Sequence, residues 1–188
     1  MKSEGEPKAR GVSLWLVPVD EAKAALSLLI AELAARLGTV AFAPHVTLVA
    51  GVTRPAADEV VRRAGELALA LEPLSLPLRR PEGSDEAFRC VHLPVGETLK
   101  LLATHALARS ALRVADERKY EPHLSLVYGT VPPEPKARLL DELAPLVPSR
   151  VEFAALEVVR TEGVVADWRT LAVFPFGGPA LGHDRRET

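Results

Sequence analysis

The sequence predicts an α+β protein built from two similar lobes, in which antiparallel sheets line a central cleft and helices cover the outer faces. Short apolar segments alternate with longer helical segments, and the order of these segments recurs in the second half of the chain. The chain has 188 residues, of which 48% are hydrophobic, so it can bury a core of its own. We therefore expect one bilobal domain over residues 1–188, with flexible polar ends at 1–10 and 177–188.

Local signals place the elements. The apolar run from 12 to 19 predicts a strand, Asp20 is placed to cap the helix that follows, and Gly38 stands just past the end of that helix. The same reasoning predicts helices at 21–37, 56–71, 97–110 and 134–146. Strands are expected at 12–19, 45–52, 74–80, 88–95, 123–129, 151–160 and 168–174. A turn at 81–85 joins the third and fourth of these strands.

Two short motifs mark the repeat most clearly. The segment PHVTL (44–48) aligns with PHLSL (122–126), and a glycine, a proline-bearing turn, a helix and two strands follow each copy. Residues i and i+2 of a strand point to the same face, so each histidine shares a face with the hydroxyl residue of its own motif. The intervening apolar residues are expected to point into the core: Val46, Leu48, Leu124 and Leu126. A pseudo-two-fold axis between the lobes would bring the two motifs together across the cleft.

The residue types in this pattern suit acid–base chemistry at phosphorus. One neutral histidine can take a proton from an attacking water while the other, protonated, gives a proton to the departing oxygen. The ordinary histidine pKa, about 6.5, suits both tasks. His45 and His123 are therefore the candidate catalytic pair, and the hydroxyls of Thr47 and Ser125 are candidate donors to the phosphate oxygens. The sequence lacks the clustered carboxylates of a magnesium site, so we expect neither a metal nor a cofactor.

The paired motifs resemble those of the two-histidine phosphoesterase superfamily, which carries His-x-Thr/Ser-x twice. The likeness runs from Ser13 to Phe176, and the stretches VSLWLVPV, FRCVHLPV and WRTLAVFPF resemble the cyclic phosphodiesterase branch from plants and yeast. This resemblance implies a bilobal fold that opens ADP-ribose 1'',2''-cyclic phosphate or converts nucleoside 2',3'-cyclic phosphates to 2'-phosphates. It also implies that His45 and His123 are the acid–base pair, with His123 favoured as the base.

Aromatic residues near the motifs are candidates to bind the rest of the substrate. Phe42 and Tyr120 each lie three residues before a motif histidine, so we place both at the lip of the cleft, with core packing as the alternative. Trp168, at the start of the last expected strand, is a further candidate for the pocket wall. Tyr128 is expected to pack in the core, and His92 to be a structural strand histidine.

Charge and composition limit the partners. The formal net charge of −2 argues against a polymeric nucleic acid, and favours a small cyclic phosphate or nucleotide as the partner of a monomer. A single cysteine, Cys90, fits a reducing compartment, and neither a signal peptide nor a membrane segment is seen, so we expect a cytoplasmic protein. Two alternatives stay open. One is RNA-end processing or a 2'-5' RNA ligase-like activity on tRNA halves, and the other is a non-catalytic nucleotide-binding module.

Overall fold

The computed structural model describes residues 7–115 and 119–177. The described residues form four α-helices and eight strands, with two short 3-10 helices, η1 (Ala87–Arg89) and η2 (Val165–Asp167). The helices are α1 (Asp20–Leu37), α2 (Ala57–Leu69), α3 (Leu99–Leu112) and α4 (Pro133–Leu143). The strands are β1 (Val12–Pro18), β2 (Val46–Val52), β3 (Leu74–Pro77), β4 (Glu82–Gly83), β5 (Val91–Pro94), β6 (His123–Val127), β7 (Arg150–Arg160) and β8 (Arg169–Pro175). Flexible ends were predicted at 1–10 and 177–188, and most of these residues lie outside the described ranges.

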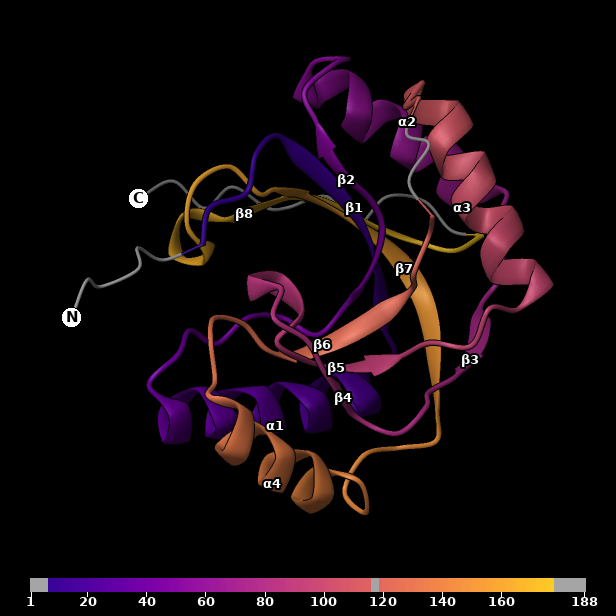
Figure 1. Cartoon of the computed structure of the whole chain (residues 1–188). Coiled ribbons are helices and arrows are strands. Elements are labelled where there is room, and N and C mark those ends of the chain that lie inside the picture. Colours follow the sequence, from indigo (N-terminus) through magenta and orange to yellow (C-terminus); the bar gives the residue numbers. More distant parts are fainter. Residues whose placement is uncertain (1–6, 116–118, 178–188) are drawn as a thin grey trace, which may run out of the picture.

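All eight strands belong to one antiparallel sheet, in the order β3-β7-β1-β2-β6-β5-β4, with β8 beside β7. The sheet curls, so that β1, β2, β7 and β8 arch over β4, β5 and β6 (Figure 1). Helices α2 and α3 pack outside the first group, and α1 and α4 outside the second. The predicted α+β class, with antiparallel strands inside and helices on the outer faces, is confirmed.

The two groups of strands meet along a narrow seam between β2 and β6, where a single residue pair, Val46 with Leu124, is in register. The halves of the sequence are interwoven across this seam. Strand β1 of the first half pairs along its whole length with β7 of the second half. Helix α1 packs on β6, and α3 packs on β2. Each lobe therefore contains elements of both halves, which fixes the two motif strands relative to each other.

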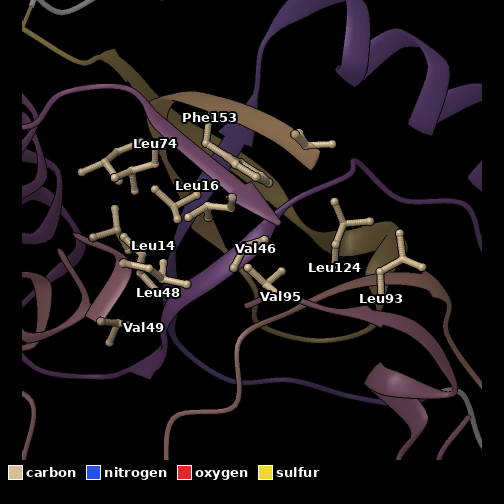
Figure 2. Packing of buried hydrophobic residues seen from close by; sticks show 14 of the residues in the cluster. Leu14, Leu16, Val46, Leu48, Val49, Leu74, Leu93, Val95, Leu124 and Phe153 are labelled. Atoms are coloured by element: carbon tan, nitrogen blue, oxygen red, sulfur yellow. The ribbon is translucent and has the colours of Figure 1, made fainter. Parts of the chain in front are cut away.

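The core lies between the sheet and the helices. All seven residues of β1 are buried because this strand runs between β7 and β2 with both faces covered. The four apolar motif residues expected in the core are at most 2% exposed, as predicted. Figure 2 shows how residues of both lobes pack against one another around Val46 and Leu124. Among the described residues, no helix is both long and apolar enough to cross a membrane.

Several predicted boundaries need correction. The strand expected at 74–80 ends at Pro77, where its partner strand β7 begins at Arg150. Residues 88 and 89, expected in a strand, belong to η1 instead, and β5 starts at Val91. Asp20 is the first residue of α1 rather than its cap, whereas Gly38 does end that helix in the left-handed conformation, with φ of 66°.

Candidate active site

The two motifs come together at the seam between β2 and β6. The residues that follow the two histidines, Val46 and Leu124, face each other across the seam. In an antiparallel pair this register sets each histidine opposite the hydroxyl residue of the other motif. The glycines six positions after the histidines, Gly51 and Gly129, both have positive φ angles, of 70° and 101°. The four motif side chains line one cleft of about 400 Å³: His45, Thr47, His123 and Ser125.

His45 is enclosed by aromatic rings. Its imidazole stacks on the ring of Trp15, with centroids 3.6 Å apart, and the edge of Phe42 lies against it. The Tyr128 hydroxyl is 3.5 Å from its Nε2, at the outer limit of a hydrogen bond. The side chain is only 7% exposed. Burial disfavours the charged ring and lowers the pKa of His45 to about 4, and the nearby His123 adds to the decrease.

His123 lies in a more open and more charged part of the same cleft. Burial also lowers its pKa below the usual 6.5, as does the Arg89 guanidinium, whereas Glu86 and Glu121 oppose the decrease. The ring of His92 meets it edge-on at 5.5 Å. Burial and the charge of His123 lower the pKa of His92 to about 4. The two catalytic candidates therefore share a cleft but differ in their surroundings.

The backbone fixes the tautomer of both motif histidines. Nδ1 of His45 is 2.7 Å from the carbonyl oxygen of Ala43, and Nδ1 of His123 is 2.8 Å from that of Glu121. A carbonyl oxygen only accepts, so Nδ1 must donate in each case. In the neutral ring Nε2 is then the proton acceptor. Both histidines thus carry their basic nitrogen on the edge of the ring opposite the backbone contact.

The two hydroxyl residues are held differently. Ser125 is 4% exposed, and its Oγ donates to the carbonyl oxygen of Phe88 at 2.9 Å. Thr47 is half-buried, pairs with Trp15 across the β1–β2 ladder and lines the cleft. Either hydroxyl can turn toward an anion bound between the histidines, but Ser125 must first release its carbonyl partner.

The structure separates the three aromatic residues that the sequence proposed as substrate contacts. Trp168 lines the cleft, where its ring is tilted against that of Trp15 at 5.9 Å. Tyr120 lines a neighbouring pocket, and its hydroxyl donates to the carbonyl oxygen of Thr47 at 3.1 Å. Phe42 does not reach the cleft lip. It stacks on Tyr128, with ring centroids 3.6 Å apart, and meets His45 with its edge.

Sequence reasoning set aside four residues that lie in or beside the cleft. Trp15 and Tyr128 form the aromatic wall around His45, although Tyr128 is as buried as predicted, at 4% exposure. His92 pairs with Ser125 across β5 and β6, which puts it beside the site. Arg89 lies in η1, at the edge of the cleft. Trp15 faces Thr47 only through the register of β1 on β2, which no local pattern gives, and no sequence signal links Arg89 to the motifs.

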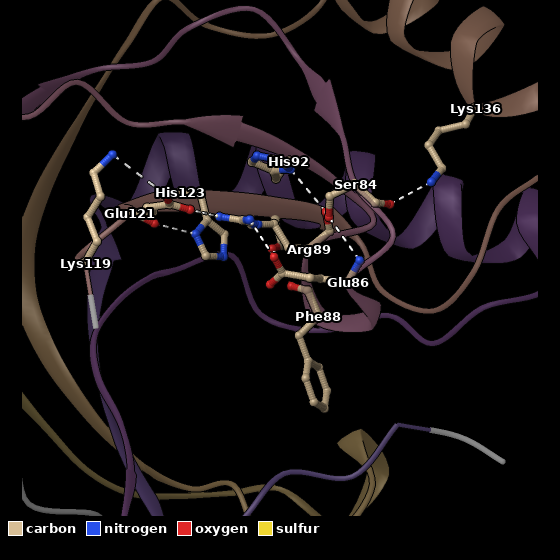
Figure 3. Close-up of polar contacts among 10 residues, drawn as sticks. Ser84, Glu86, Phe88, Arg89, His92, Lys119, Glu121, His123 and Lys136 are labelled. Atoms are coloured by element: carbon tan, nitrogen blue, oxygen red, sulfur yellow. Dashed lines mark hydrogen bonds and ion pairs between the residues drawn. The ribbon is translucent and has the colours of Figure 1, made fainter. Parts of the chain in front are cut away.

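Arg89 organises the charged side of the cleft. Its guanidinium donates to Glu86 at 2.6 Å and to Glu121 at 2.7 Å, and Glu121 supplies the carbonyl oxygen that orients His123 (Figure 3). The backbone oxygen of Arg89 accepts hydrogen bonds from the Ser84 hydroxyl and from Nδ1 of His92. Both glutamates are exposed, so screening by solvent weakens these ion pairs, and their main effect is to hold the guanidinium in place.

This arrangement can perform acid–base chemistry on a small anion. Two imidazoles with Nε2 available and two hydroxyl donors converge on one cleft, whose aromatic wall excludes water from one side. Within residues 7–115 and 119–177, no three His, Cys, Asp or Glu side chains gather as metal ligands would. The fold and the cleft together define a two-lobed phosphoesterase with paired His-x-Thr/Ser motifs.

Comparisons with solved structures show that other proteins share this fold. The structure of TT0787 from Thermus thermophilus superposes with a TM-score of 0.59 at 18% identity, over 89% of this chain and 98% of that one. The apo structure of E. coli LigT gives 0.55 at 14% identity, over 90% and 99%. A protein described as a phosphoesterase gives 0.54 at 12% identity, also over 90% and 99%. These likenesses establish a shared fold. No protein with a curated description matches the chain by sequence.

A family profile identifies the group within this class. The profile described as cyclic phosphodiesterase-like protein matches residues 10–176, which is nearly the whole chain. The chain therefore belongs to the cyclic phosphodiesterase-like protein family.

Proposed function

We propose that the protein hydrolyses small cyclic phosphodiesters by paired histidine catalysis that needs no metal ion. The substrates we favour are nucleoside 2',3'-cyclic phosphates, opened to 2'-phosphates, or ADP-ribose 1'',2''-cyclic phosphate. The observation that carries the proposal is the shared cleft of about 400 Å³, in which His45, Thr47, His123 and Ser125 converge. Family membership supports the same kind of reaction.

In the proposed reaction a water oxygen attacks phosphorus as a ring oxygen leaves. A new P–O bond forms, one P–O bond of the ring breaks, and the product is a phosphomonoester. The base takes the proton of the attacking water on its Nε2, and the acid gives a proton to the departing ring oxygen. The hydroxyls of Thr47 and Ser125 donate to the non-bridging oxygens, where negative charge grows.

We assign the base to His123 and the acid to His45. His123 is the more exposed ring, so water reaches it more readily. His45 lies on the face of Trp15, which favours a cation, and an imidazolium formed there is shielded from water. The negative charge of a bound phosphate raises the pKa of both rings and so supplies the acid with its proton. No metal step is required, because the two histidines and the two hydroxyls provide both proton transfers and the anion contacts.

Phosphorus NMR tests the proposal directly. The purified protein is incubated in a metal chelator with uridine 2',3'-cyclic phosphate, ADP-ribose 1'',2''-cyclic phosphate or an oligonucleotide that ends in a cyclic phosphate. We expect the small cyclic phosphates to be converted to monoesters, and the position of the product phosphate reports which P–O bond breaks. Loss of turnover in chelator would overturn the metal-free mechanism. Turnover of the oligonucleotide alone would favour RNA-end processing, and binding without turnover would favour a nucleotide-binding module.

The matched control replaces a charged residue outside the cleft. Lys100 lies on α3, is 70% exposed and pairs with Glu72, and it is not among the residues that line the catalytic cleft. His45→Gln and His123→Gln should each abolish conversion on the time scale of the experiment, whereas Lys100→Gln should retain it. Equal loss in all three variants would indicate general disruption of the fold.

A further inference from the structure

His92 lies beside His123 on the neighbouring strand of the sheet. Strands β5 and β6 are antiparallel, and their register sets His92 opposite Ser125, two residues after His123. Side chains two residues apart on a strand share a face, so the rings of His92 and His123 project from the same face of the sheet. The two rings meet edge-on with their centroids 5.5 Å apart, a geometry typical of packed aromatic pairs. His92 therefore contacts the ring that we propose as the base.

The ring of His123 needs such a contact because it borders a pocket. A space of about 330 Å³ is lined by both His92 and His123. The hydrogen bond from Nδ1 of His123 to the carbonyl oxygen of Glu121 holds one edge of the ring. A ring that turned toward the pocket would lose this bond and would point its basic Nε2 away from the attacking water. The edge contact with His92 restricts that movement.

His92 is itself held by a chain of hydrogen bonds that ends on helix α4 (Figure 3). Its Nδ1 donates to the carbonyl oxygen of Arg89 at 3.1 Å, and the Ser84 hydroxyl donates to the same oxygen at 2.7 Å. The carbonyl oxygen of Ser84 accepts a hydrogen bond from Nζ of Lys136 at 2.6 Å. The orientation of the His92 ring is thus connected, through the turn that precedes η1, to a side chain of α4.

Lys136 is suited to anchor this chain because it is buried. The residue is 8% exposed, and its stem passes so close to the backbone of Gly83 that a Cβ atom there would lie 2.7 Å from the lysine Cδ. The carboxylate of Asp85, 3.3 Å from Nζ, is fully exposed, so this ion pair contributes little. Burying an ammonium group is costly unless its donors are used. The bond to the Ser84 carbonyl is therefore the main contact of this amine.

His92 places a neutral ring next to His123. It is 6% exposed, and burial, together with the charges of His123 and Arg89, lowers the pKa of His92 to about 4. A neutral neighbour does not oppose the positive charge that His123 acquires when it takes a proton from water. His92 can therefore hold the base in place without weakening it.

We propose that His92 is a positioning residue for the base His123, and that Lys136 anchors His92 through Ser84 and the carbonyl of Arg89. This inference rests on the proposed function, in which His123 takes the proton of the attacking water. His92 neither exchanges a proton with His123 nor touches the substrate. Its ring keeps Nε2 of His123 directed into the catalytic cleft.

Steady-state kinetics with uridine 2',3'-cyclic phosphate on variants of His92 test the inference. His92→Ala should lower kcat by about tenfold and change KM by less than about twofold, because the base is misaligned while the residues that bind the substrate stay in place. His92→Phe keeps the ring contact and should restore most of kcat. Unchanged kcat in His92→Ala would overturn the inference. Equal losses in His92→Ala and His92→Phe would also overturn it, because the ring nitrogens rather than the ring contact would then matter.

Thermal unfolding controls for damage to the fold. If His92→Ala unfolds below the assay temperature, His92→Val takes its place, because valine suits a strand but is too short to reach the ring of His123. The same loss of kcat is expected, and an unchanged kcat in this variant would contradict the inference.

Substitutions on α4 test the anchor. Lys136→Met should lower kcat by about threefold in the wild type and have no effect in the His92→Phe background, where the bond to the Arg89 carbonyl no longer exists. The matched control is Arg138→Met, because Arg138 lies on the same helix, is 72% exposed and pairs with Glu134. The control should leave kcat unchanged in both backgrounds. Equal losses from Lys136→Met in both backgrounds would show that Lys136 does not act through His92.

NMR of the histidine rings tests the inference without turnover. Long-range ¹H–¹⁵N spectra of the free protein at pH 7 show which ring nitrogen carries the proton. We expect His123 to carry it on Nδ1 in the wild type and in His92→Phe, and to populate both tautomers in His92→Ala. His45 should keep its proton on Nδ1 throughout, because Ala43 orients it independently. An unchanged His123 tautomer in His92→Ala would overturn the inference.

The failure of this inference differs from that of the proposed function. A wild-type protein that turns over no cyclic phosphate would overturn the proposed function, and the His123 tautomer would then decide alone whether His92 orients this ring. Turnover that is insensitive to His92→Ala would leave the hydrolase intact and remove the positioning role.

Discussion

The two motif strands carry the same residue types in contrasting surroundings. His45 stacks on the ring of Trp15, meets the edge of Phe42 and is almost fully buried. His123 lies beside the Arg89 ion pairs and lines the cleft together with the two pockets that adjoin it. The backbone contact at Nδ1 is the same in both. The two motifs thus share their backbone contacts, whereas the cleft walls around them differ: the wall at His45 is aromatic and buried, and the wall at His123 is charged and more exposed.

Replacing the two histidines should have the largest effect on activity. His45→Gln and His123→Gln should each lower kcat/KM by about 10²–10⁴-fold, the usual range for an acid or a base.

Because the pKa values of His45 and His123 both lie below 6.5, the wild-type profile of kcat/KM against pH should be bell-shaped with its maximum below pH 6.5. The rate rises with pH as the base loses its proton, so His123→Gln should lose the acidic limb and His45→Gln the alkaline limb. The opposite pattern would exchange the two roles.

The deeper burial of His45 should also make the free energy of unfolding depend on pH in the acidic range. The unfolded His45 takes up a proton near pH 6.5 and the folded one only near pH 4, so the unfolded state binds more protons between these values. The free energy of unfolding therefore falls by up to about 3 kcal/mol as the pH drops from 6.5 to 4. Below pH 4, His45 causes no further change in it. Urea unfolding at pH 7 and pH 4.5 should show a smaller difference for His45→Gln than for the wild type.

The same urea unfolding experiment compares the contributions of the two motif histidines to the pH dependence of stability. His123 is less buried, so His123→Gln should reduce the pH dependence by less than His45→Gln does. An equal pH dependence in the wild type and in His45→Gln would show that His45 is not the buried neutral group described.

The two hydroxyls should differ in their importance. Thr47→Val removes a hydroxyl on the cleft wall and should lower kcat/KM by about 10²-fold, as loss of an oxyanion donor does. Ser125→Ala should cost about tenfold, because Ser125 must break its bond to the carbonyl oxygen of Phe88 before it can donate to the phosphate. Steady-state kinetics on both variants show which loss of kcat/KM is larger, and thermal unfolding serves as the control for the fold. A larger loss for Ser125→Ala would show that its carbonyl contact does not restrain it.

The smallest effect on activity is expected at Tyr120, which differs from its counterpart in the first half, Phe42, only by a hydroxyl. Tyr120 and Phe42 stand three residues before their histidines, and Tyr120 alone donates to a carbonyl oxygen, that of Thr47. Tyr120→Phe should lower the free energy of unfolding by about 1 kcal/mol and change kcat/KM by no more than about threefold. A loss of activity far beyond this, at unchanged stability, would mean that the hydroxyl touches the substrate.

Local patterns determined most of the element order and the pair of motifs. The alternation of Val46, Thr47 and Leu48 shows which side chains face the core, because the two-residue period of a strand is a property of the backbone itself. Strand ends were less predictable. Pro77 ends β3 because the partner residue Arg150 begins β7, and that partner is 73 residues away in the sequence.

The sequence by itself determined that two His-x-Thr/Ser motifs occur on equivalent strands of a duplicated framework. Only the tertiary structure decided what surrounds them: Trp15 beneath His45, Arg89 and His92 beside His123, and the arginine-lined pocket next to the cleft. Burial, ring stacking and charge act through space, between residues that long stretches of chain separate. They set the pKa values and shape the pockets, so equal motifs acquire unequal properties only once the lobes have folded together.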